Sequence, residues 1–265
     1  MRARSAQKKS KTKTLQIAVL FTVVVVLIIG ISLIIKVCLL FSRSTFDSTH
    51  QYIFQINHSQ ERSSVIIFDP DTQKIALLHL HGSDANAPLA QTLHIPADSK
   101  IDEIQDKSIS HDGIHELLID GHQLNIIDKL KLLLYSQTVA SEDIHTIDVF
   151  LPLTSSTDGL LTPFLTDQSM YKEGVSIAII NGSGIAGLGN NTAAILEHIG
   201  ANVISVTTAD KESPTSSLVY TGEKKYTVSR IEKILSLHAQ SISTQHIATI
   251  TITLGADAKK KLKNI

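Results

Sequence analysis

Three glycines that follow a short apolar run are the clearest candidate for ligand chemistry in this chain. The segment Asn181–Leu188 reads NGSGIAGL, which contains the G-x-G-x-x-G spacing of a phosphate-binding turn. In such a turn the glycines let the backbone approach an anion closely, and N–H groups at the start of the next helix bind it. The pattern therefore indicates a phosphate or carboxylate site whose residues are Asn181, Gly182, Ser183, Gly184 and Gly187.

The elements around the glycines decide whether this is a nucleotide site. An apolar strand pattern at Val175–Ile180 and a helical pattern at Leu188–Ile199 place the glycines between a strand and a helix. A dinucleotide site also needs an acidic residue at the end of the next strand, but Asn202–Thr207 has none and Asp210 lies beyond it. The segment is also too short for both halves of a dinucleotide-binding sheet, so we expect no nicotinamide or flavin cofactor.

The glycines also have an explanation that needs no ligand. We expect Gly182 and Gly184 to adopt positive φ in the turn, which glycine does without strain. We expect Gly187 to let the helix pack closely against the sheet. Ser183 lacks the G-x-S-x-G spacing of a catalytic serine, so the N–H groups at the helix start are the chemistry that this turn offers.

Other residues with metal-binding or catalytic chemistry are isolated. His79 and His81 lie on one face of a predicted strand, with His94 further along, but no further zinc ligand is evident. Asp69 and Asp71 flank a proline and are typical of a turn exposed to water. The sequence therefore predicts no metal site, no cofactor and no catalytic residue.

The N-terminal residues predict a membrane anchor. Leu15–Ile35 has no charged residue and makes a helix of roughly 31 Å, close to the thickness of the hydrocarbon core of a bilayer. Six basic residues and no acidic residue precede it, and only two basic residues follow closely, which favours a cytoplasmic N-terminus. No A-x-A-like cleavage site follows. We therefore assign residues 1–14 to a cytoplasmic basic tail and residues 15–41 to a retained transmembrane helix in the lipid bilayer.

Composition limits what the exported part can bind. Residues 1–43 hold eight of the 24 Lys and Arg and none of the 25 Asp and Glu, so the remainder has a formal charge of −9. This charge excludes nucleic acid as a partner and disfavours broad electrostatic binding to anionic polymers. Cys38, at the membrane boundary, is the only cysteine, so the exported part has no disulfide and depends on its own apolar core.

The first part of the exported region, residues 44–165, is predicted to be a small α/β region. Its predicted elements are a hairpin, a helix and a strand, at Ser63–Phe68 with Lys74–Leu80, Gln123–Tyr135 and Ile144–Leu153. The segment Leu153–Gly174, rich in Ser, Thr, Asp, Gly and Pro, is predicted to connect this region to a second domain.

The second domain, residues 174–265, has a β-α-β-β-α-β pattern. Its predicted strands and helices are Val175–Ile180, Leu188–Ile199, Asn202–Thr207, Ser217–Tyr220, Thr227–Ala239 and Ala248–Leu254. The predicted fold class is therefore α/β, with an N-terminal transmembrane helix, a small α/β middle region and a C-terminal β-α-β-β-α-β domain.

The residues of this second domain resemble the LytR C-terminal domain. Val175–Leu188, VSIAIINGSGIAGL, is similar to the first strand and N-G-[ST]-G-x-A-G-L turn of that domain, and Leu254–Asp257 is similar to its L-G-x-D ending. The resemblance implies a bacterial cell-envelope protein, since the domain occurs in such proteins, often behind a LytR–CpsA–Psr catalytic domain. It implies binding of a wall glycan or a partner and no established activity.

The middle region is faintly similar to LytR–CpsA–Psr enzymes, which transfer a glycopolymer from polyprenyl diphosphate to peptidoglycan. Asp69–Lys74 is similar to the D-P-x-T-K-K hairpin of that family, but Ser64, or Glu61 in another register, stands where its first metal-binding Asp is expected. The Arg of its S-I-P-R-D motif is replaced by Gly82 or, in another alignment, by Ala97, which precedes Asp98. The resemblance therefore implies a degenerate region that lacks the cation for a diphosphate.

These features together predict a single-pass cell-membrane protein with a cytoplasmic N-terminus and extracytoplasmic domains. We expect it to bind peptidoglycan, a wall glycopolymer or an envelope protein through its C-terminal domain, without catalysis and without nucleic acid. The alternative is a divergent LytR–CpsA–Psr phosphotransferase.

Overall fold

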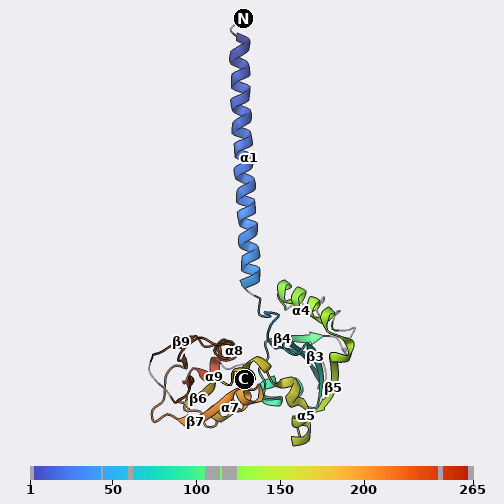
Figure 1. Ribbon diagram of the computed structural model, residues 1–265, viewed down its shortest axis with the longest axis vertical. Helices are drawn as coiled ribbons and strands as arrows, with labels where there is room; N and C mark the ends of the chain where they lie inside the picture. The colour runs from blue at the N-terminus through green and yellow to red at the C-terminus, as the bar shows by residue number, and fades with distance from the viewer. Residues whose placement is uncertain are drawn as a thin grey trace. The chain divides into compact units, whose positions relative to one another are not determined.

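The computed structural model describes residues 3–42, 44–58, 62–104, 114, 124–243 and 247–261 of the chain. The chain divides into two compact units. The first unit consists of Met1–Thr45 with Asn125–Asp128, and the second of Phe46–Leu124 with Lys129–Ile265. Figure 1 shows the helices and strands and labels part of them.

The first unit contains one long helix, α1 (Ala3–Ser42). Its segment Val19–Ser42 is long and apolar enough to cross a membrane, and none of that segment is buried. A helix that exposes apolar side chains all round is typical of a membrane span, because water would solvate it poorly. This observation is compatible with the membrane anchor predicted at residues 15–41.

The second unit contains two sheets, of which the first has the strand order β4-β1-β2-β3-β5. Its strands are β1 (Tyr52–His58), β2 (Arg62–Asp69), β3 (Lys74–His81), β4 (Ser99–Ile104) and β5 (Ile144–Phe150). The strands β1, β2 and β3 are antiparallel neighbours, whereas β4 is parallel to β1 and β5 is parallel to β3. The predicted hairpin is confirmed as the β2–β3 pair, with Asp69 opposite Lys74.

Both faces of the first sheet are covered, which explains why its central strands read as nearly continuous apolar runs. Tyr52, Phe54 and Leu77 belong to one buried apolar cluster, together with Leu132 from helix α4 (Ile126–Thr138). The alternate residues of the same strands, among them Ile53, belong to a second cluster on the opposite face. The start predicted for the helix, Gln123, lies outside the described residues.

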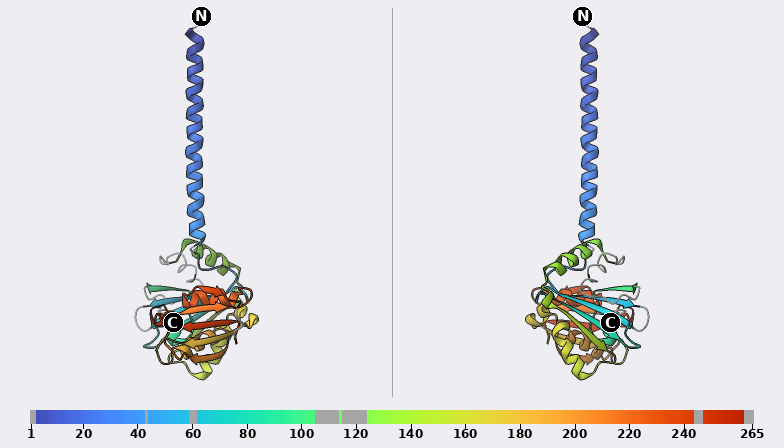
Figure 2. Two further views of the ribbon diagram at one scale, coloured as in Figure 1. Left: turned by 90° about the vertical axis from the view of Figure 1, so that its left-hand side faces the viewer. Right: turned by 90° about the vertical axis from the view of Figure 1, so that its right-hand side faces the viewer.

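The second sheet has the strand order β7-β6-β10-β8-β9. Its strands are β6 (Ser176–Asn181), β7 (Asn202–Thr208), β8 (Ser217–Tyr220), β9 (Ala239–Ser241) and β10 (Ile250–Leu254). The strand β6 is parallel to both β7 and β10, and β8 is antiparallel to β10. In Figure 2 the first sheet is cyan to green and the second is orange to red.

Three of the described helices belong to this second region: α7 (Leu188–His198), α8 (Tyr226–Leu235) and the short helix α9 (Ala258–Lys261). The observed order, β-α-β-β-α-β-β-α, contains the predicted pattern and adds the short strand β9 and the short helix α9. The predicted helix Thr227–Ala239 is too long: Ser236 has a left-handed φ of +51°, which ends α8, and Ala239 already pairs in β9.

One apolar cluster includes side chains from both sheets. Ile53 and Leu78 of the first sheet belong to it, as do Ile179 and Ile252 of the second sheet and Ile231 of α8. The second sheet therefore completes its core with residues that lie far earlier in the chain. The predicted boundaries of the middle and C-terminal domains stay a prediction.

The segment Leu153–Gly174 is not the irregular connection that its composition suggests. It folds into helices α5 (Ser155–Leu165) and α6 (Gln168–Glu173). Thr154 and Asp167 are the N-caps of these helices, and each side chain accepts a hydrogen bond from the backbone N–H three residues later. Three of its apolar side chains are buried in the shared cluster: Leu161, Leu165 and Met170. The polar residues that suggested a linker are thus the start signals of two helices.

Candidate functional site

The glycine turn lies where three parallel strands end. Asn181 is the last residue of β6 and is paired with Leu254, the last residue of β10. The Gly182 N–H donates a hydrogen bond to the Leu254 carbonyl at 2.9 Å. The helix α7 begins at Leu188 with Gly187 as its N-cap. In open α/β sheets, ligands bind at this edge, outside the carboxyl ends of the strands.

The polar groups of the turn bond mainly to one another. The Asn181 Oδ1 accepts hydrogen bonds from the Ser183 hydroxyl at 2.6 Å and from the Ser183 N–H at 3.2 Å. The Asn181 Nδ2 donates to the Ile185 carbonyl at 2.9 Å, and the Ser183 Oγ accepts from the Ile185 N–H at 3.1 Å. Asn181 and Ser183 are buried. Their first role is therefore to hold the turn in shape.

The structure exchanges the roles predicted for Gly182 and Gly187. Gly182 does not adopt a positive φ; a Cβ there would lie 3.2 Å from the Ser213 nitrogen and 3.3 Å from the Leu254 carbonyl oxygen. Gly187 has a φ of +78°, and no atom lies within 4 Å of its Cβ position. Gly182 is needed for close packing and Gly187 for its left-handed backbone, whereas Gly184, with a φ of +73°, behaves as predicted.

The close approach of α7 to the sheet occurs at Gly189, two residues after the predicted position. A Cβ at Gly189 would lie 3.1 Å from Val206 Cγ1 and 3.2 Å from Asn181 Cβ. The spacing of the motif alone does not identify this glycine, because the contact depends on which helix residue faces the sheet.

The loop between β7 and β8, residues 209–216, lies against the turn. The Ser213 N–H donates to the Gly182 carbonyl at 2.7 Å, and the Ser213 carbonyl accepts from the Ala256 N–H at 2.8 Å. The Glu212 side chain is so close to Gly184 that a Cβ there would lie 2.6 Å from Oε1. The chain thus places its own residues and a negative charge beside the turn, which disfavours an anion next to Gly184.

The L-G-x-D ending secures the same loop. The Ser216 N–H and hydroxyl both donate to Asp257 Oδ1 at 2.6 Å, and the Gly255 N–H donates to Ser216 Oγ at 2.9 Å. A Cβ at Gly255 would lie only 2.3 Å from the carbonyl carbon of Thr215. The sequence pattern did not identify Ser213, Ser216 or Glu212, because their roles depend on a loop that folds back onto the turn.

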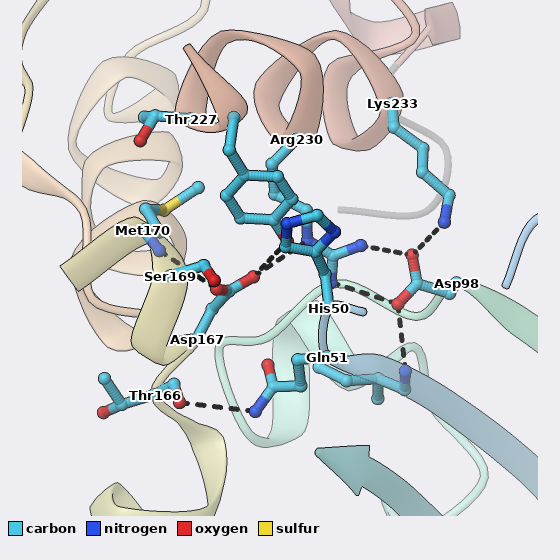
Figure 3. A network of polar contacts seen from close by, with 12 residues as sticks. His50, Gln51, Asp98, Thr166, Asp167, Ser169, Met170, Thr227, Arg230 and Lys233 are labelled. Atoms are coloured by element: carbon cyan, nitrogen blue, oxygen red, sulfur yellow. Dashed lines mark hydrogen bonds and ion pairs between the residues drawn. The ribbon is translucent and has the colours of Figure 1, made fainter. Parts of the chain in front are cut away.

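A second polar cluster joins α8 to the first sheet (Figure 3). Arg230, in α8, forms a two-point ion pair with Asp98, with distances of 2.5 Å from Nη1 to Oδ1 and 3.0 Å from Nη2 to Oδ2. The Asp98 Oδ2 also accepts the Ile53 N–H of β1 at 2.9 Å, and Lys233 Nζ lies 2.9 Å from Oδ1. Asp98 and Arg230 are both buried, so their charges depend on each other.

Asp167 and Tyr226 extend this cluster. The Tyr226 hydroxyl donates to Asp167 Oδ2 at 2.6 Å, and the other carboxylate oxygen caps α6 by accepting the Met170 N–H at 3.1 Å. Arg230 Nε lies 3.6 Å from Asp167 Oδ2, which is close enough for an ion pair but too long for a hydrogen bond. The His50 ring stacks on Tyr226 with centroids 3.8 Å apart. The cluster therefore links the residues before β1 to α6 and α8.

The charges of the cluster shift the pKa values of its members. Burial alone would raise the pKa of Asp98, but the charges of Arg230 and Lys233 outweigh it and hold that pKa below its ordinary value of 3.8. Burial opposes the charge of Arg230, yet Asp98 raises the Arg230 pKa above its ordinary value. Burial raises the pKa of Tyr226, and Asp167 adds to that rise. The Asp98–Arg230 pair is therefore ionised at neutral pH.

Arg230 was not identified from the sequence, because its partner Asp98 lies 132 residues away. One signal was available: Arg230 lies four residues before Ile234 and three after Thr227, so the helical period places it on the buried face of α8. A buried arginine needs an anionic partner. Since both terminal nitrogens of the guanidinium bond to Asp98, Arg230 belongs to an internal ion pair.

The histidines considered as metal ligands do not converge. His79 Nδ1 lies 3.1 Å from Ser64 Oγ, and this hydroxyl is 3.0 Å from His58 Nε2. His81 Nε2 lies 2.8 Å from Asp148 Oδ1. Among the described residues, no group of three His, Cys, Asp or Glu is arranged to hold a metal ion. Ser64 is buried, and its hydroxyl is within hydrogen-bond distance of both imidazoles.

His94, Asp69 and Asp71 have local contacts. The Asp69 carboxylate accepts the Asp71 N–H at 3.1 Å and the Thr72 hydroxyl at 2.6 Å, which closes the turn between β2 and β3. The His94 ring stacks with His198, with centroids 6.1 Å apart. These contacts explain the residues as parts of the fold.

Comparison with known proteins identifies the C-terminal part of the chain. Residues 174–257 match the family described as LytR cell envelope-related transcriptional attenuator. This match starts before β6 and ends at Asp257, so it includes the glycine turn and the residues that secure its loop. No curated protein and no solved structure matches the chain. The resemblance to the LytR C-terminal domain is therefore confirmed, and it indicates a protein associated with the cell envelope.

Proposed function

With a LytR C-terminal domain at residues 174–257 as the premise, we propose that this protein is a membrane-anchored envelope protein that binds without catalysis. Its ligand is a cell-wall component, such as peptidoglycan, or another envelope protein. The observation that carries the proposal is the presence, in one chain, of this domain and of an apolar helix able to cross a membrane.

The orientation follows from charge. Six basic residues precede the apolar segment and favour a cytoplasmic N-terminus. The remainder would then be extracytoplasmic, where wall polymers and envelope proteins are available. Protease treatment of intact spheroplasts tests this: we expect the second unit to be digested while a tag before Arg2 survives.

The absence of catalysis in the proposal is supported by how the polar groups are used. The buried Asp98–Arg230 pair is internal, and the Asn181 and Ser183 side chains bond within the turn. The exported part carries a formal charge of −9, so it does not attract a diphosphate or an anionic glycopolymer at long range. These features favour a neutral glycan or a protein as the ligand.

We place the binding surface at the glycine turn, the site that the sequence predicts. Ile185 is an exposed large apolar residue of this turn, and Glu212 is exposed beside Gly184. An apolar side chain beside a carboxylate can pack on a sugar ring or peptide and accept its hydrogen bonds.

The experiment is co-sedimentation of the full-length protein, in detergent micelles, with purified sacculi. We expect the wild-type protein to sediment and the Ile185→Ser/Glu212→Gln variant to lose most of that binding. Leu160→Ser, which removes an exposed apolar residue from α5, is the matched control and should bind like wild type. Equal binding by both variants would remove the turn from the proposal. If the wild-type protein stays in the supernatant, wall binding is wrong and an affinity search for an envelope protein is the remaining test.

The phosphotransferase alternative has its own test. Incubation of the full-length protein with a polyprenyl-diphosphate-linked donor, peptidoglycan and Mg²⁺ should transfer no glycan. Transfer that depends on Mg²⁺ would contradict the non-catalytic proposal directly.

A further inference from the structure

The helix α4 carries apolar residues on two different faces. Leu132 is fully buried against the first sheet. Ile126, Leu130 and Leu134 are 65%, 53% and 55% exposed. These three residues are four positions apart, so they form one stripe along the helix, over about 12 Å. We call them the α4 stripe. Exposure of these apolar side chains to water is unfavourable, so the α4 stripe is a candidate contact surface.

The start of α4 is bonded to the end of α1. Asp128 accepts hydrogen bonds from the Ser44 hydroxyl at 2.6 Å and from the Thr45 N–H at 3.0 Å. The Asn125 Nδ2 donates to the carbonyl oxygen of Leu40 at 3.1 Å. These residues all belong to the first compact unit, which joins Met1–Thr45 to Asn125–Asp128.

These bonds fix the depth of the first stripe residue relative to the apolar segment. The segment suited to a membrane ends at Ser42, and Ile126 directly follows the residue that bonds to Leu40. Ile126 therefore lies beside the end of the apolar segment, which would be at the boundary between lipid and water in the proposed anchored protein. Since α4 is one continuous helix, Leu130 and Leu134 follow it at successive turns.

We propose that the α4 stripe rests on the outer surface of the same bilayer that α1 crosses, with its side chains in the region between headgroups and acyl chains. Interfacial helices bury an apolar face to this depth, and lipid contact would remove the three exposed side chains from water. Lipid is favoured over a second copy of the chain because two exported parts, each with a formal charge of −9, repel each other. This inference rests on the proposed membrane anchoring.

The test uses the full-length protein in lipid vesicles, with one spin label per molecule. Each labelled variant carries Cys38→Ser and one new cysteine. The new cysteine is Leu130→Cys or Leu134→Cys in the stripe, Ile28→Cys in α1, or Leu160→Cys, an exposed leucine of α5. Collisions with oxygen, which concentrates in lipid, are compared with collisions with a water-soluble nickel chelate. We expect oxygen to dominate at positions 28, 130 and 134 and the chelate to dominate at position 160.

The outcomes separate the two proposals. If position 28 is in lipid but positions 130 and 134 behave like position 160, the stripe does not contact the bilayer while the anchor stands. If position 28 is itself accessible to the chelate, the anchor is wrong, and this inference fails with it. Because all the substituted side chains are exposed, labelling should not disturb the fold.

Discussion

The glycine turn and the Asp98–Arg230 pair both hold polar groups away from water, but they do so over very different distances along the chain. In the turn, Asn181 bonds to Ser183 and Ile185, within four residues. In the pair, the two partners are 132 residues apart: Asp98 directly precedes β4 of the first sheet, and Arg230 lies in α8, in the region of the second sheet. The turn is a local structure that other elements pack against, whereas the pair is a connection between regions.

This difference affects how each should respond to change. A turn held by several neutral hydrogen bonds and by glycine backbone geometry loses stability in small steps. A buried charge that loses its only strong partner leaves the other charge desolvated and unpaired, which costs more. The free energies of unfolding of single variants should therefore differ between the two regions.

The largest expected effect is at Arg230. Arg230→Met should lower the free energy of unfolding by about 3–5 kcal/mol, because it leaves Asp98 charged and buried beside Lys233 alone. Chemical denaturation measures this, with Lys211→Met, an exposed cation, as the control that should change it by less than about 0.5 kcal/mol. If the two variants are equally stable, the pair does not connect the regions energetically.

The second effect is at Gly255, in the loop-securing ending. Gly255→Ala should cost about 1–3 kcal/mol, since its Cβ would overlap the Thr215 carbonyl carbon at 2.3 Å and backbone must move. Gly159→Ala is the matched control: it lies in α5 with no atom within 4 Å of its Cβ position and should gain up to about 1 kcal/mol of stability. Thermal unfolding of both variants checks the difference, and equal melting temperatures would contradict it.

The pH dependence of the free energy of unfolding tests the contribution of the Asp98 charge. The pKa of Asp98 is held below its ordinary value of 3.8 in the folded protein, so the stabilisation is complete above about pH 4 and is lost as the pH falls through the folded pKa. Unfolding free energies of wild type and Asp98→Asn, measured from pH 7 to pH 2, should therefore differ most at neutral pH and converge in acid. A constant difference across that range would show that the charge of Asp98 does not contribute.

A smaller effect is expected at the start of α7. Gly187→Ala should cost about 1 kcal/mol, because φ is +78° there while the space around the Cβ position is open. Gly187→Asn, which tolerates left-handed backbone better than alanine, should recover part of this loss. Urea denaturation distinguishes them. If alanine costs nothing, the left-handed N-cap is not what this glycine provides.

The smallest stability effect is expected at Glu212. Glu212→Gln should change the unfolding free energy by less than about 0.5 kcal/mol, because the side chain is exposed. The substitution should affect ligand binding more than stability. Removal of the carboxylate beside Gly184 should increase the affinity of the turn for phosphate. Titration with inorganic phosphate, followed by NMR of the turn amides, measures this. Unchanged amide signals in both proteins would remove the anion site that the motif predicts.

Much of the fold could be predicted because its signals are local. The uncharged run from Leu15 and the alternation around the Asp69–Pro70 turn predict a membrane helix and a hairpin from period and length alone. The segment Leu153–Gly174 could not be predicted in the same way. Its Ser, Thr and Pro content suggests a linker, and its N-cap residues Thr154 and Asp167 are equally typical of turns. The burial of Leu161 and Met170 in a core shared by both sheets adds the tertiary contacts that stabilise the helices.

The candidate site also has features that follow from local sequence and features that depend on distant residues. The position of the glycine turn between a strand and a helix follows from residues 175–199, and the family match includes it. The reason why each position needs glycine does not follow from these residues. At Gly182, for example, the space for a side chain is occupied by Ser213 and Leu254, which come from other parts of the chain. Spacing shows where glycines are, while their neighbours in space decide what each one permits.

The apolar span and the glycine turn can be read from the sequence, because periodicity, charge and turn chemistry act over a few neighbouring residues. The LytR C-terminal domain was identified by its resemblance to a known family. Only the tertiary structure decided that Arg230 meets Asp98, that α5 and α6 complete the core, and that residues 209–216 lie against the turn. Such contacts depend on which distant groups can be buried together at the lowest cost in desolvation, and that balance is set by the whole fold.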